Sequence, residues 1–404
     1  MLLLCHKYMP SMGGLQIYAE WVARTLQEEG HDVTVWTTTA EAPGPGFERI
    51  NGVAVRRFRP VLASHTPMFA TPGMLPALLR REARRADVVH SIGFLFAFTP
   101  IAWMLRSFFG VRWSVAPVFS FYPRTRERWL YERLFGRPLL RAADLVMPHS
   151  QGEVGIMRER GFRFRRLEVV PYGIDPSFRR ETAVRSEDPS WRTRHPLSGR
   201  FPLILFVGKL MSSKGCFDLV EAMALLRRRM PGAAAILVGG ETSERAALHA
   251  RIEELGLADH VACAGIVRDP AEKAWLFEQA SVVAFPSQHE QFGIVGIEAA
   301  ASGRPLAATP VGVLPEIAEG LGIGLVHAFG DPEGLATNLA RLAEDGSFRE
   351  RAERQRDQVF LRYLWPNVAR RTVRLLSELA MKDPVKSVDA PPTTTAPGRG
   401  PETT

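Results

Sequence analysis

Two carboxylates, Glu290 and Glu298, stand with seven residues between them in the stretch SQHEQFGIVGIE. The strand-like run SVVAFPS overlaps its start, so Glu290 is expected in the loop beyond a strand and Glu298 inside the following helix. The amides of Phe292, Gly293 and Ile294 would then form a helix N-terminus, whose unpaired N–H groups bind phosphate readily. Alternatively, Glu290 caps this helix and Glu298 lies on a solvated face.

A pair of lysines flanks a polar turn in FVGKLMSSKGCFDLV, after the first strand expected in the second half of the chain. Lysine is scarce, at six of 51 basic residues, so the proximity of Lys209 and Lys214 favours a function over simple solvation. Gly208 precedes the pair, and Gly215 permits a close approach of the backbone. Two cations beside a helix start suit a diphosphate, although the turn does not match a P-loop.

The third stretch, PSMGGLQIYAE, places Gly13 and Gly14 between the first strand and the first helix. It lacks the G-x-G-x-x-G spacing of a dinucleotide site, so a ligand-facing turn and a tight turn without a ligand both stay open. In open parallel sheets, ligands bind beyond the carboxyl ends of the strands. With two such domains, the active site is expected in the cleft between them.

Strand and helix patterns alternate along the chain, which predicts parallel sheets covered on both faces. The first helix, within GGLQIYAEWVARTLQEEG, carries Tyr18, Trp21, Val22, Thr25 and Leu26 on one face. Strands are expected in the first half at 2–5, 32–38, 87–91, 111–118, 144–150 and 167–173. Strands are expected in the second half at 201–208, 233–240, 261–265, 281–287, 305–311 and 322–326.

The length of 404 residues predicts two domains. The polar stretch 179–200 is interpreted as a linker between units 1–178 and 201–362, and the Pro/Thr-rich tail 383–404 as disordered. Three scattered cysteines, Cys5, Cys216 and Cys263, indicate reduced thiols rather than a disulfide framework or zinc site.

The start MLLLCHKYMP does not resemble a signal peptide, and the longest apolar run, Gly93–Leu105, is too short to span a bilayer. A soluble, cytoplasmic protein is therefore expected. The formal charge of +8 is compatible with anionic partners, but the basic residues form no recognisable nucleic-acid-binding motif.

Several of these motifs resemble those of the retaining GT-B glycosyltransferases of glycosyltransferase family 4. They include VGKL…KG, VVPYGID, the N-terminal P…GG and, most specifically, the stretch 284–317 around EQFGIVGIE. The resemblance implies an α/β GT-B fold, with two Rossmann-like doubly wound domains facing each other across a cleft. It makes 1–178 the acceptor domain, 201–362 the nucleotide-sugar-binding domain and 363–382 a helix crossing back to the first.

The resemblance also implies an enzyme that transfers a hexose from a nucleotide-diphosphate sugar to a hydroxyl acceptor, with retention of anomeric configuration. Glu298 would bind the ribose hydroxyls and Glu290 the hexose. Lys209 and Lys214, assigned to catalysis with Glu290, would hold the diphosphate. The donor-binding set is Gly13, Gly14, Gly208, Lys209, Lys214, Glu290, Phe292, Gly293, Ile294 and Glu298.

No D-x-D motif occurs, so a metal-independent reaction without a cofactor is expected. Many family members carry a histidine where Val118 or Ser120 stands here, and His90 and His149 are more typical of structural residues. No catalytic histidine is therefore assigned. A catalytically degenerate GT-B scaffold and a nucleotide-sugar epimerase are the alternatives.

The acceptor is expected on the first domain, as a sugar, a lipid-linked group or a small molecule. In the stretch 122–141, arginines, among them Arg124, Arg133 and Arg137, alternate with Trp129 and Phe135. A core-packed helix with solvated arginines is slightly favoured there over peripheral contact with an anionic membrane. The apolar segment 93–109 is better explained as a buried helix than as a lipid-acceptor surface.

Overall fold

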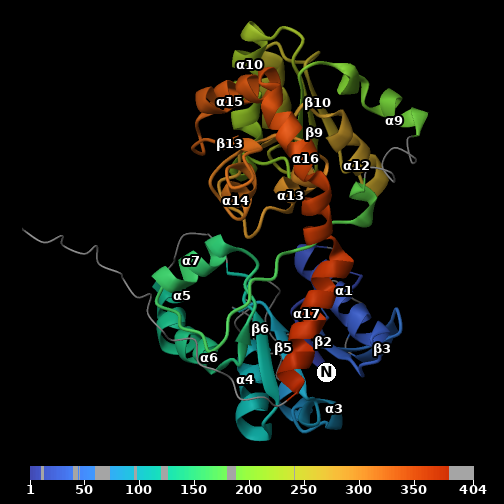
Figure 1. Cartoon of the computed structure of the whole chain (residues 1–404), viewed down its shortest axis with the longest axis vertical. Helices are drawn as coiled ribbons and strands as arrows, with labels where there is room; N and C mark the ends of the chain where they lie inside the picture. Colours follow the sequence, from blue (N-terminus) through green and yellow to red (C-terminus); the bar gives the residue numbers. More distant parts are fainter. Residues whose placement is uncertain are drawn as a thin grey trace, which may run out of the picture.

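The computed structural model describes residues 1–10, 13–39, 44, 46–59, 73–94, 98–119, 126–179, 188–240 and 242–381. Two sheets divide these residues into a first and a second half, which Figure 1 shows stacked along the long axis. The predictions for the tail 383–404, for Arg124 and Ser120, and for residues 95–97 of the apolar segment 93–109 fall outside the described residues.

The first sheet has seven strands in the order β3-β4-β2-β1-β5-β6-β7, and all neighbours are parallel except β3 and β4. Its strands are β1 (Leu2–Cys5), β2 (Thr34–Thr38), β3 (Gly46–Ile50), β4 (Val53–Phe58), β5 (Val88–Ile92), β6 (Arg112–Ala116) and β7 (Leu145–Val146). The helices of this half are α1 (Gly14–Glu28), α2 (Met74–Ala77), α3 (Arg81–Arg84), α4 (Phe98–Phe109), α5 (Arg126–Tyr131), the π-helical turn η1 (Glu132–Gly136), α6 (Arg137–Ala142) and α7 (Gln151–Glu159).

The second sheet has six strands, all parallel, in the order β10-β9-β8-β11-β12-β13. They are β8 (Leu203–Val207), β9 (Ala234–Val238), β10 (Val261–Gly265), β11 (Val282–Phe285), β12 (Leu306–Ala308) and β13 (Gly324–Val326). The helices are α9 (Pro189–Arg194), α10 (Cys216–Arg229), α11 (Arg245–Glu254), α12 (Pro270–Gln279), α13 (Ile294–Ala301), α14 (Leu314–Ala318), α15 (Pro332–Glu344), α16 (Gly346–Tyr363) and α17 (Trp365–Ala380), with short 3₁₀ turns η2 (Pro176–Phe178), η3 (Pro196–Gly199) and η4 (Ser212–Lys214).

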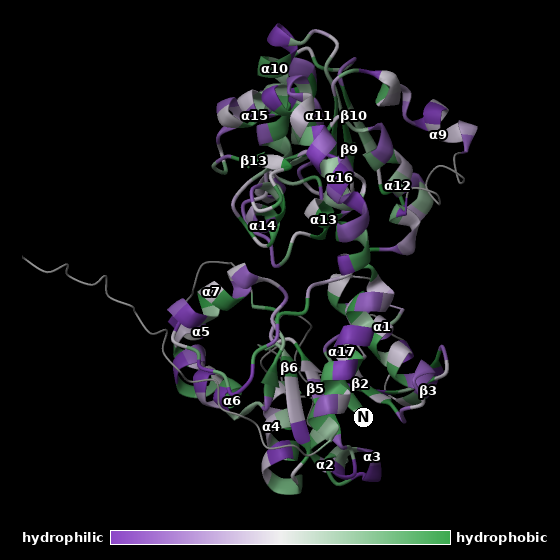
Figure 2. Ribbon diagram, in the orientation of Figure 1, coloured by the Kyte–Doolittle hydropathy of each residue, from purple (hydrophilic) through white to green (hydrophobic). Residues whose placement is uncertain are grey.

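The central strands are buried along their whole length, as in β9 with the sequence AAILV. This burial arises because helices cover both faces of a parallel sheet, which leaves no face for polar residues. Figure 2 shows largely apolar strands in both halves, between helices in which apolar and polar residues are mixed. The expected face of α1 is largely correct, since Tyr18, Val22, Thr25 and Leu26 are buried while Trp21 is only partly covered.

Two features of the first half differ from the expected strand pattern. Strands β3 and β4 form an antiparallel hairpin, so this sheet is mixed rather than purely parallel. Asn51 and Gly52 connect them with positive φ angles of 50° and 84°, the Asn-Gly signature of a tight hairpin turn. The segment 167–173 forms no strand; its contact with the sheet is a single bridge between Val146 and Leu167.

The segment 188–200, which is the described part of the stretch interpreted as a linker, packs on the second half. Asp188 caps α9, and the buried Trp191 lies against Trp275 of α12 with ring centroids 5.7 Å apart. The turn η3 contacts β8, β9 and α12. The exact division of the chain near residues 178 and 201 stays a prediction.

The last two helices, α16 and α17, join the two halves. Helix α16 packs against α13 of the second half, and α17 packs against α1 of the first, as Figure 1 shows. At the junction, the amide of Ile174 donates to the carbonyl of Tyr363 at 2.7 Å, and the amide of Trp365 donates to Ile174 at 3.2 Å. The indole of Trp365 lies so close over Gly173 that a Cβ there would be within 2.7 Å of its Cγ.

We expect Gly173→Ala to destabilise the protein by about 1–3 kcal/mol, because a methyl group has no room beneath the packed indole. The matched control is Gly155→Ala on α7, where an added Cβ meets nothing within 4 Å. That change should stabilise the helix by roughly 0.5–1 kcal/mol. Urea unfolding midpoints measure both effects, and a shift in the same direction for both variants would contradict this account of the junction.

Candidate functional site

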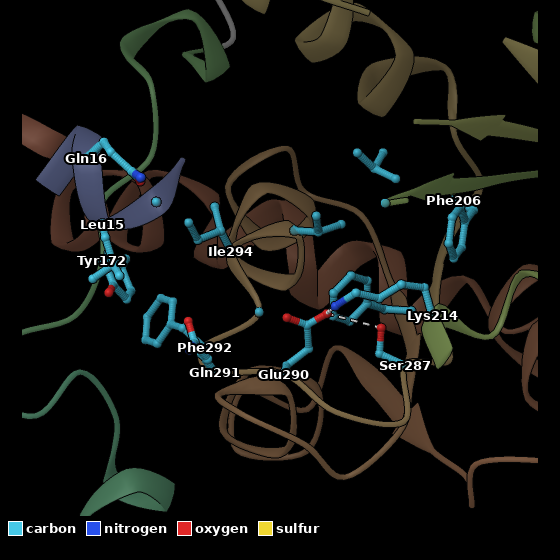
Figure 3. Close-up of a pocket in the computed structure, with 16 residues that line it drawn as sticks. Leu15, Gln16, Tyr172, Phe206, Lys214, Ser287, Glu290, Gln291, Phe292 and Ile294 are labelled. Atoms are coloured by element: carbon cyan, nitrogen blue, oxygen red, sulfur yellow. Dashed lines mark hydrogen bonds and ion pairs between the residues drawn. The ribbon is translucent and has the colours of Figure 1, made fainter. Parts of the chain in front are cut away.

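A pocket of about 410 Å³ lies where the two halves meet. Figure 3 shows Gln16 and Tyr172 on its first-half side and Lys214, Glu290 and Phe292 on its second-half side. Its lining is Gly14, Leu15, Gln16, Tyr172, Phe206, Val207, Gly208, Lys214, Phe285, Ser287, Glu290, Gln291, Phe292, Gly293, Ile294 and Val295. Most of these residues follow the carboxyl ends of strands, which is where ligands bind in open α/β sheets.

Two helix N-termini converge on this pocket. Helix α1 begins at Gly14 and α13 at Ile294, and a Cβ added at Gly14 would lie 3.5 Å from Cδ1 of Ile294. Both helices are preceded by a glycine, Gly13 and Gly293, and neither has a side-chain cap. The first-turn amides and the positive ends of both helix dipoles therefore point toward one space, a favourable environment for an anion.

Glycine is required at Gly293 and Gly215 by the backbone. Gly293 takes a φ of 95° immediately before α13, and Gly215 takes a φ of 74° between η4 and α10. A Cβ at Gly215 would lie 2.7 Å from the carbonyl carbon of Pro286, so the turn that carries Lys214 packs directly on the loop after β11. Left-handed backbone and close approach both favour glycine.

The ammonium group of Lys214 forms an ion pair with Oε1 of Glu290, and it also donates to the carbonyl of His289 at 3.4 Å. Ser287 donates to the same carboxylate oxygen at 3.1 Å. Glu290 therefore does not cap α13; it faces the pocket together with the lysine, as Figure 3 shows. A cation and an acid held side by side can bind a phosphate and a hydroxyl group, respectively.

Glu298 is buried on α13, with 5% of its surface exposed, so it does not lie on a solvated face. Its Oε1 accepts a hydrogen bond from Lys273 of α12 at 2.6 Å. Its Oε2 is buried and has no hydrogen-bond partner among the described residues. A buried carboxylate oxygen without a partner is costly, which makes Oε2 a candidate acceptor for a ligand hydroxyl group.

The structure brings together Gly14, Gly208, Lys214, Glu290, Phe292, Gly293 and Ile294 of the expected site. Gly13 lies immediately before the lining, as the residue preceding α1. Lys209 is exposed and is not part of the lining, although its neighbour Gly208 is. Glu298 lies one turn into α13, outside the lining.

Sequence reasoning missed several lining residues, including Gln16, Tyr172, Phe206, Ser287 and Gln291. Ser287 could have been found, since it is a polar residue directly after a buried strand. Tyr172 also had a signal, since it lies in the motif VVPYGID quoted above, whereas Phe206 had none, because an aromatic residue in a buried strand is equally typical of a core.

The described residues contain no group of three or more histidine, cysteine or acidic side chains arranged to hold a metal ion. No helix among them is long and apolar enough to cross a membrane.

Comparison with known proteins agrees with this architecture. Residues 13–173 match the family model of the glycosyl transferase 4-like domain, and residues 187–359 match that of glycosyl transferases group 1. The chain is 30% identical to D-inositol 3-phosphate glycosyltransferase of Corynebacterium jeikeium, over 83% of this chain and 85% of the relative. It is 29% identical to the protein of the same name from Corynebacterium urealyticum, over 91% of each.

The chain belongs to glycosyltransferase family 4. Its fold is GT-B, as in sucrose-phosphate synthase from Thermosynechococcus elongatus, with a TM-score of 0.74, 23% identity and coverage of 94% of this chain and 98% of that one. Anabaena Alr3699/HepE, solved in complex with UDP and glucose, has a TM-score of 0.70, 19% identity and coverage of 93% and 99%. The expected family, fold class and glycosyltransferase activity are thereby confirmed.

Among the described residues that line the pocket of this family 4 chain, none is a histidine. Val118, one of the two residues considered at the family's histidine position, adopts a φ of 52°, which is a strained conformation for a β-branched residue. His90 and His149 are buried in the first half. His90 contacts the Tyr18 hydroxyl at 3.2 Å, and Nδ1 of His149 donates to the Val170 carbonyl at 2.7 Å.

Burial lowers the pKa of His149 to about 4, against an opposing contribution from its hydrogen bond to Val170. Burial, reinforced by the neighbouring His149, lowers the pKa of His90 to about 3. Both rings are therefore neutral at physiological pH. His149 packs against Tyr172, with ring centroids 4.0 Å apart, so its protonation would disturb the wall of the pocket.

We expect the contribution of His149 to folding stability to decrease in acid. Its folded-state pKa lies below the unfolded value, so its contribution is complete above pH 6.5 and declines as the pH falls toward 4. Between roughly pH 8 and pH 5 the loss from this one group is about 2 kcal/mol. His149→Asn retains an N–H donor for Val170 but cannot titrate, and it should flatten the pH dependence.

Urea unfolding at a series of pH values measures this change, with His249→Asn on α11 as the matched control. An unchanged slope in His149→Asn would show that the acid sensitivity arises elsewhere.

Proposed function

We propose that this glycosyltransferase transfers a hexose from a nucleotide-diphosphate sugar to a hydroxyl acceptor, with retention of anomeric configuration and without a metal ion. One observation carries the proposal: the uncapped N-termini of α1 and α13 meet at a single pocket that also holds Lys214. Cleavage of the donor leaves negative charge on the nucleoside diphosphate. Fixed amides and a cation stabilise such charge most where it develops.

The donor would lie across this pocket with its diphosphate at the amides near Gly293 and Ile294 and beside Lys214. Glu290 would contact the hexose, and Gly14 would approach the diphosphate and the sugar from the first half. Lys209 and the backbone of Gly208, at the edge of the pocket, would also contact the diphosphate. The backbone of Gly13 would contact it from the first half.

Glu298 would bind the ribose through Oε2, the carboxylate oxygen for which no described residue is a hydrogen-bond partner. Its other oxygen is already bonded to Lys273, which fixes the side chain in one orientation. A ribose hydroxyl donating to Oε2 would satisfy a buried acceptor, so binding would recover the desolvation cost of that oxygen.

The reaction would need no protein nucleophile. A leaving-group phosphate oxygen on the sugar's own face can take the acceptor proton, which delivers the hydroxyl to that face and retains the configuration. The lining supports this proposal, because its carboxylate, Glu290, is engaged by Lys214 and Ser287. No group in this scheme requires a cofactor.

The acceptor would bind on the first half, and the enzyme would act in the cytoplasm, with peripheral contact at an anionic membrane. The relatives' names make an inositol phosphate hydroxyl one candidate acceptor. The complex of Anabaena Alr3699/HepE with UDP makes a UDP-sugar the first donor to test.

We expect one nucleoside diphosphate among UDP, GDP, ADP and dTDP to raise the melting temperature of the protein. A ligand at a hundred times its Kd stabilises the native state by about 2.7 kcal/mol. Lys214→Met should weaken that binding about 10–100-fold, since it removes a charge-assisted hydrogen bond. Lys209→Met tests the marginal lysine in the same assay.

The matched control is Arg228→Met, an exposed residue near the end of α10 that removes the same charge far from the pocket. Absence of a shift with every nucleotide would favour the degenerate scaffold over the enzyme.

We expect the purified enzyme to turn over its nucleotide sugar in the presence of EDTA and to give a product with the anomeric configuration of the donor. Proton NMR of the product measures the anomeric coupling directly. Inversion would exclude the proposed mechanism, and loss of activity in EDTA that added Mg²⁺ restores would exclude metal independence. Isomerised donor without transfer would instead indicate an epimerase.

A further inference from the structure

A second concavity, of about 530 Å³, lies in the first half between α6 and the loop after α7. Five arginines line it: Arg133, Arg137, Arg141, Arg163 and Arg165. None of them belongs to the donor pocket. We call this concavity the arginine pocket.

The charge of the arginine pocket is almost uncompensated. In the described part of the chain, no carboxylate pairs with Arg133, Arg137, Arg141 or Arg163. Arg165 lies 3.7 Å from Asp144, but that carboxylate is already held by Arg106 through two hydrogen bonds, at 2.8 and 3.0 Å. Like charges gathered around one cavity repel each other, so an anion in the cavity is strongly favoured.

The guanidinium group of Arg137 has an N–H donor, at Nε, that is buried and that no described residue accepts. The side chain is held against Gly161, where an added Cβ would lie 3.2 Å from the guanidinium carbon. Arginine donors in a fixed plane match the oxygens of a phosphate group.

Large apolar side chains lie exposed beside the arginine pocket, on α5 and η1. Trp129, Leu130, Leu134 and Phe135 expose 40%, 49%, 54% and 59% of their surfaces. Leu130 and Leu134 are four positions apart, as are Arg133 and Arg137, so an apolar and a basic stripe run side by side along one helical segment. The helical segment expected from the sequence to pack on the core therefore also has a second, solvent-exposed face. Figure 1 shows α5 and α6 at the outer flank of this half.

We propose that this face docks on an anionic lipid bilayer, with a lipid headgroup phosphate in the arginine pocket and the apolar side chains of α5 and η1 in the acyl boundary. Charge complementarity identifies the occupant. A soluble phosphate would use the arginines but would leave the neighbouring tryptophan, leucines and phenylalanine exposed. Basic residues on one stripe and Trp, Phe and Leu on the next are the combination that binds an anionic interface.

The test is co-sedimentation of the full chain with vesicles, without donor or turnover, so its result is independent of the proposed reaction. The protein should sediment with phosphatidylcholine vesicles that contain phosphatidylglycerol and stay in solution with phosphatidylcholine alone. Added salt should weaken the binding. A variant combining Arg133→Gln, Arg141→Gln and Arg163→Gln removes three exposed charges of the pocket. Since each basic residue contributes about fivefold, it should bind on the order of a hundredfold more weakly.

The matched control removes the same number of charges from the second half, through Arg228→Gln, Arg349→Gln and Arg354→Gln, and should bind like the unaltered chain. A second variant, Leu130→Ser with Leu134→Ser, should still bind the vesicles at low salt. As salt is added, it should dissociate at a lower salt concentration than the unaltered protein. Melting temperatures of all variants report whether they are folded.

Three results would overturn the proposal. The first is no sedimentation with anionic vesicles, and the second is an equal loss of binding in the control variant. The third is a protein that does not bind vesicles but whose melting temperature rises with inorganic phosphate, an effect that the triple arginine variant loses. This result would assign the arginine pocket to a soluble phosphate.

Discussion

The position of the donor pocket depends on one aromatic contact between the two halves. Tyr172, from the end of the first half, packs against Phe292 at the entrance to α13, with ring centroids 5.1 Å apart. Tyr18 of α1 lies 6.0 Å from Tyr172, and Trp365 of α17 lies 6.3 Å from it. These rings connect the helix that brings Gly14 to the site with the loop that brings Glu290. The spacing of the two helix N-termini therefore follows from apolar packing, to which two residues of the pocket wall, Tyr172 and Phe292, contribute.

This arrangement also explains the ion pair between Lys214 and Glu290. Two helix dipoles and a lysine at one point produce a strongly positive environment. The carboxylate of Glu290 balances that charge and holds the lysine in place through its hydrogen bond. A bound diphosphate would share Lys214 with Oε1 of Glu290, and Oε2 would face the sugar hydroxyl group.

The sequence was sufficient where the chemistry lies within one continuous stretch. Glu290, Gly293 and Ile294 follow a buried strand and begin a helix, so their position at a sheet edge could be predicted from local pattern alone. Lys209 was less predictable, because Phe206, Val207 and Gly208 line the pocket in succession while the exposed Lys209 directly after them does not. The hairpin at Asn51 could also have been predicted, because the pair Asn51-Gly52 is typical of a two-residue hairpin turn.

Other features depend on contacts between distant residues and have no local signal. Lys273 bonds Glu298 from a different helix, and no spacing rule relates the two. The burial of Glu298 was in principle foreseeable, since the sequence IVGIEAAA of α13 offers no polar face on which an acid could be solvated. Its unpartnered oxygen follows only from the packing of α12 against α13.

The two candidate anion sites of the molecule are built on opposite principles. In the donor pocket, positive charge comes from amides and one lysine, and Glu290 already neutralises part of it, so affinity depends on short-range geometry. In the arginine pocket, the charge is nearly uncompensated and exposed, so its attraction extends over about a Debye length, roughly 10 Å, and declines with salt. A surface of the second kind can gather an enzyme at a charged interface without fixing one ligand. A pocket of the first kind selects a ligand but cannot attract it from a distance. The proposed separation of the two sites on one chain would allow docking and donor binding to vary independently.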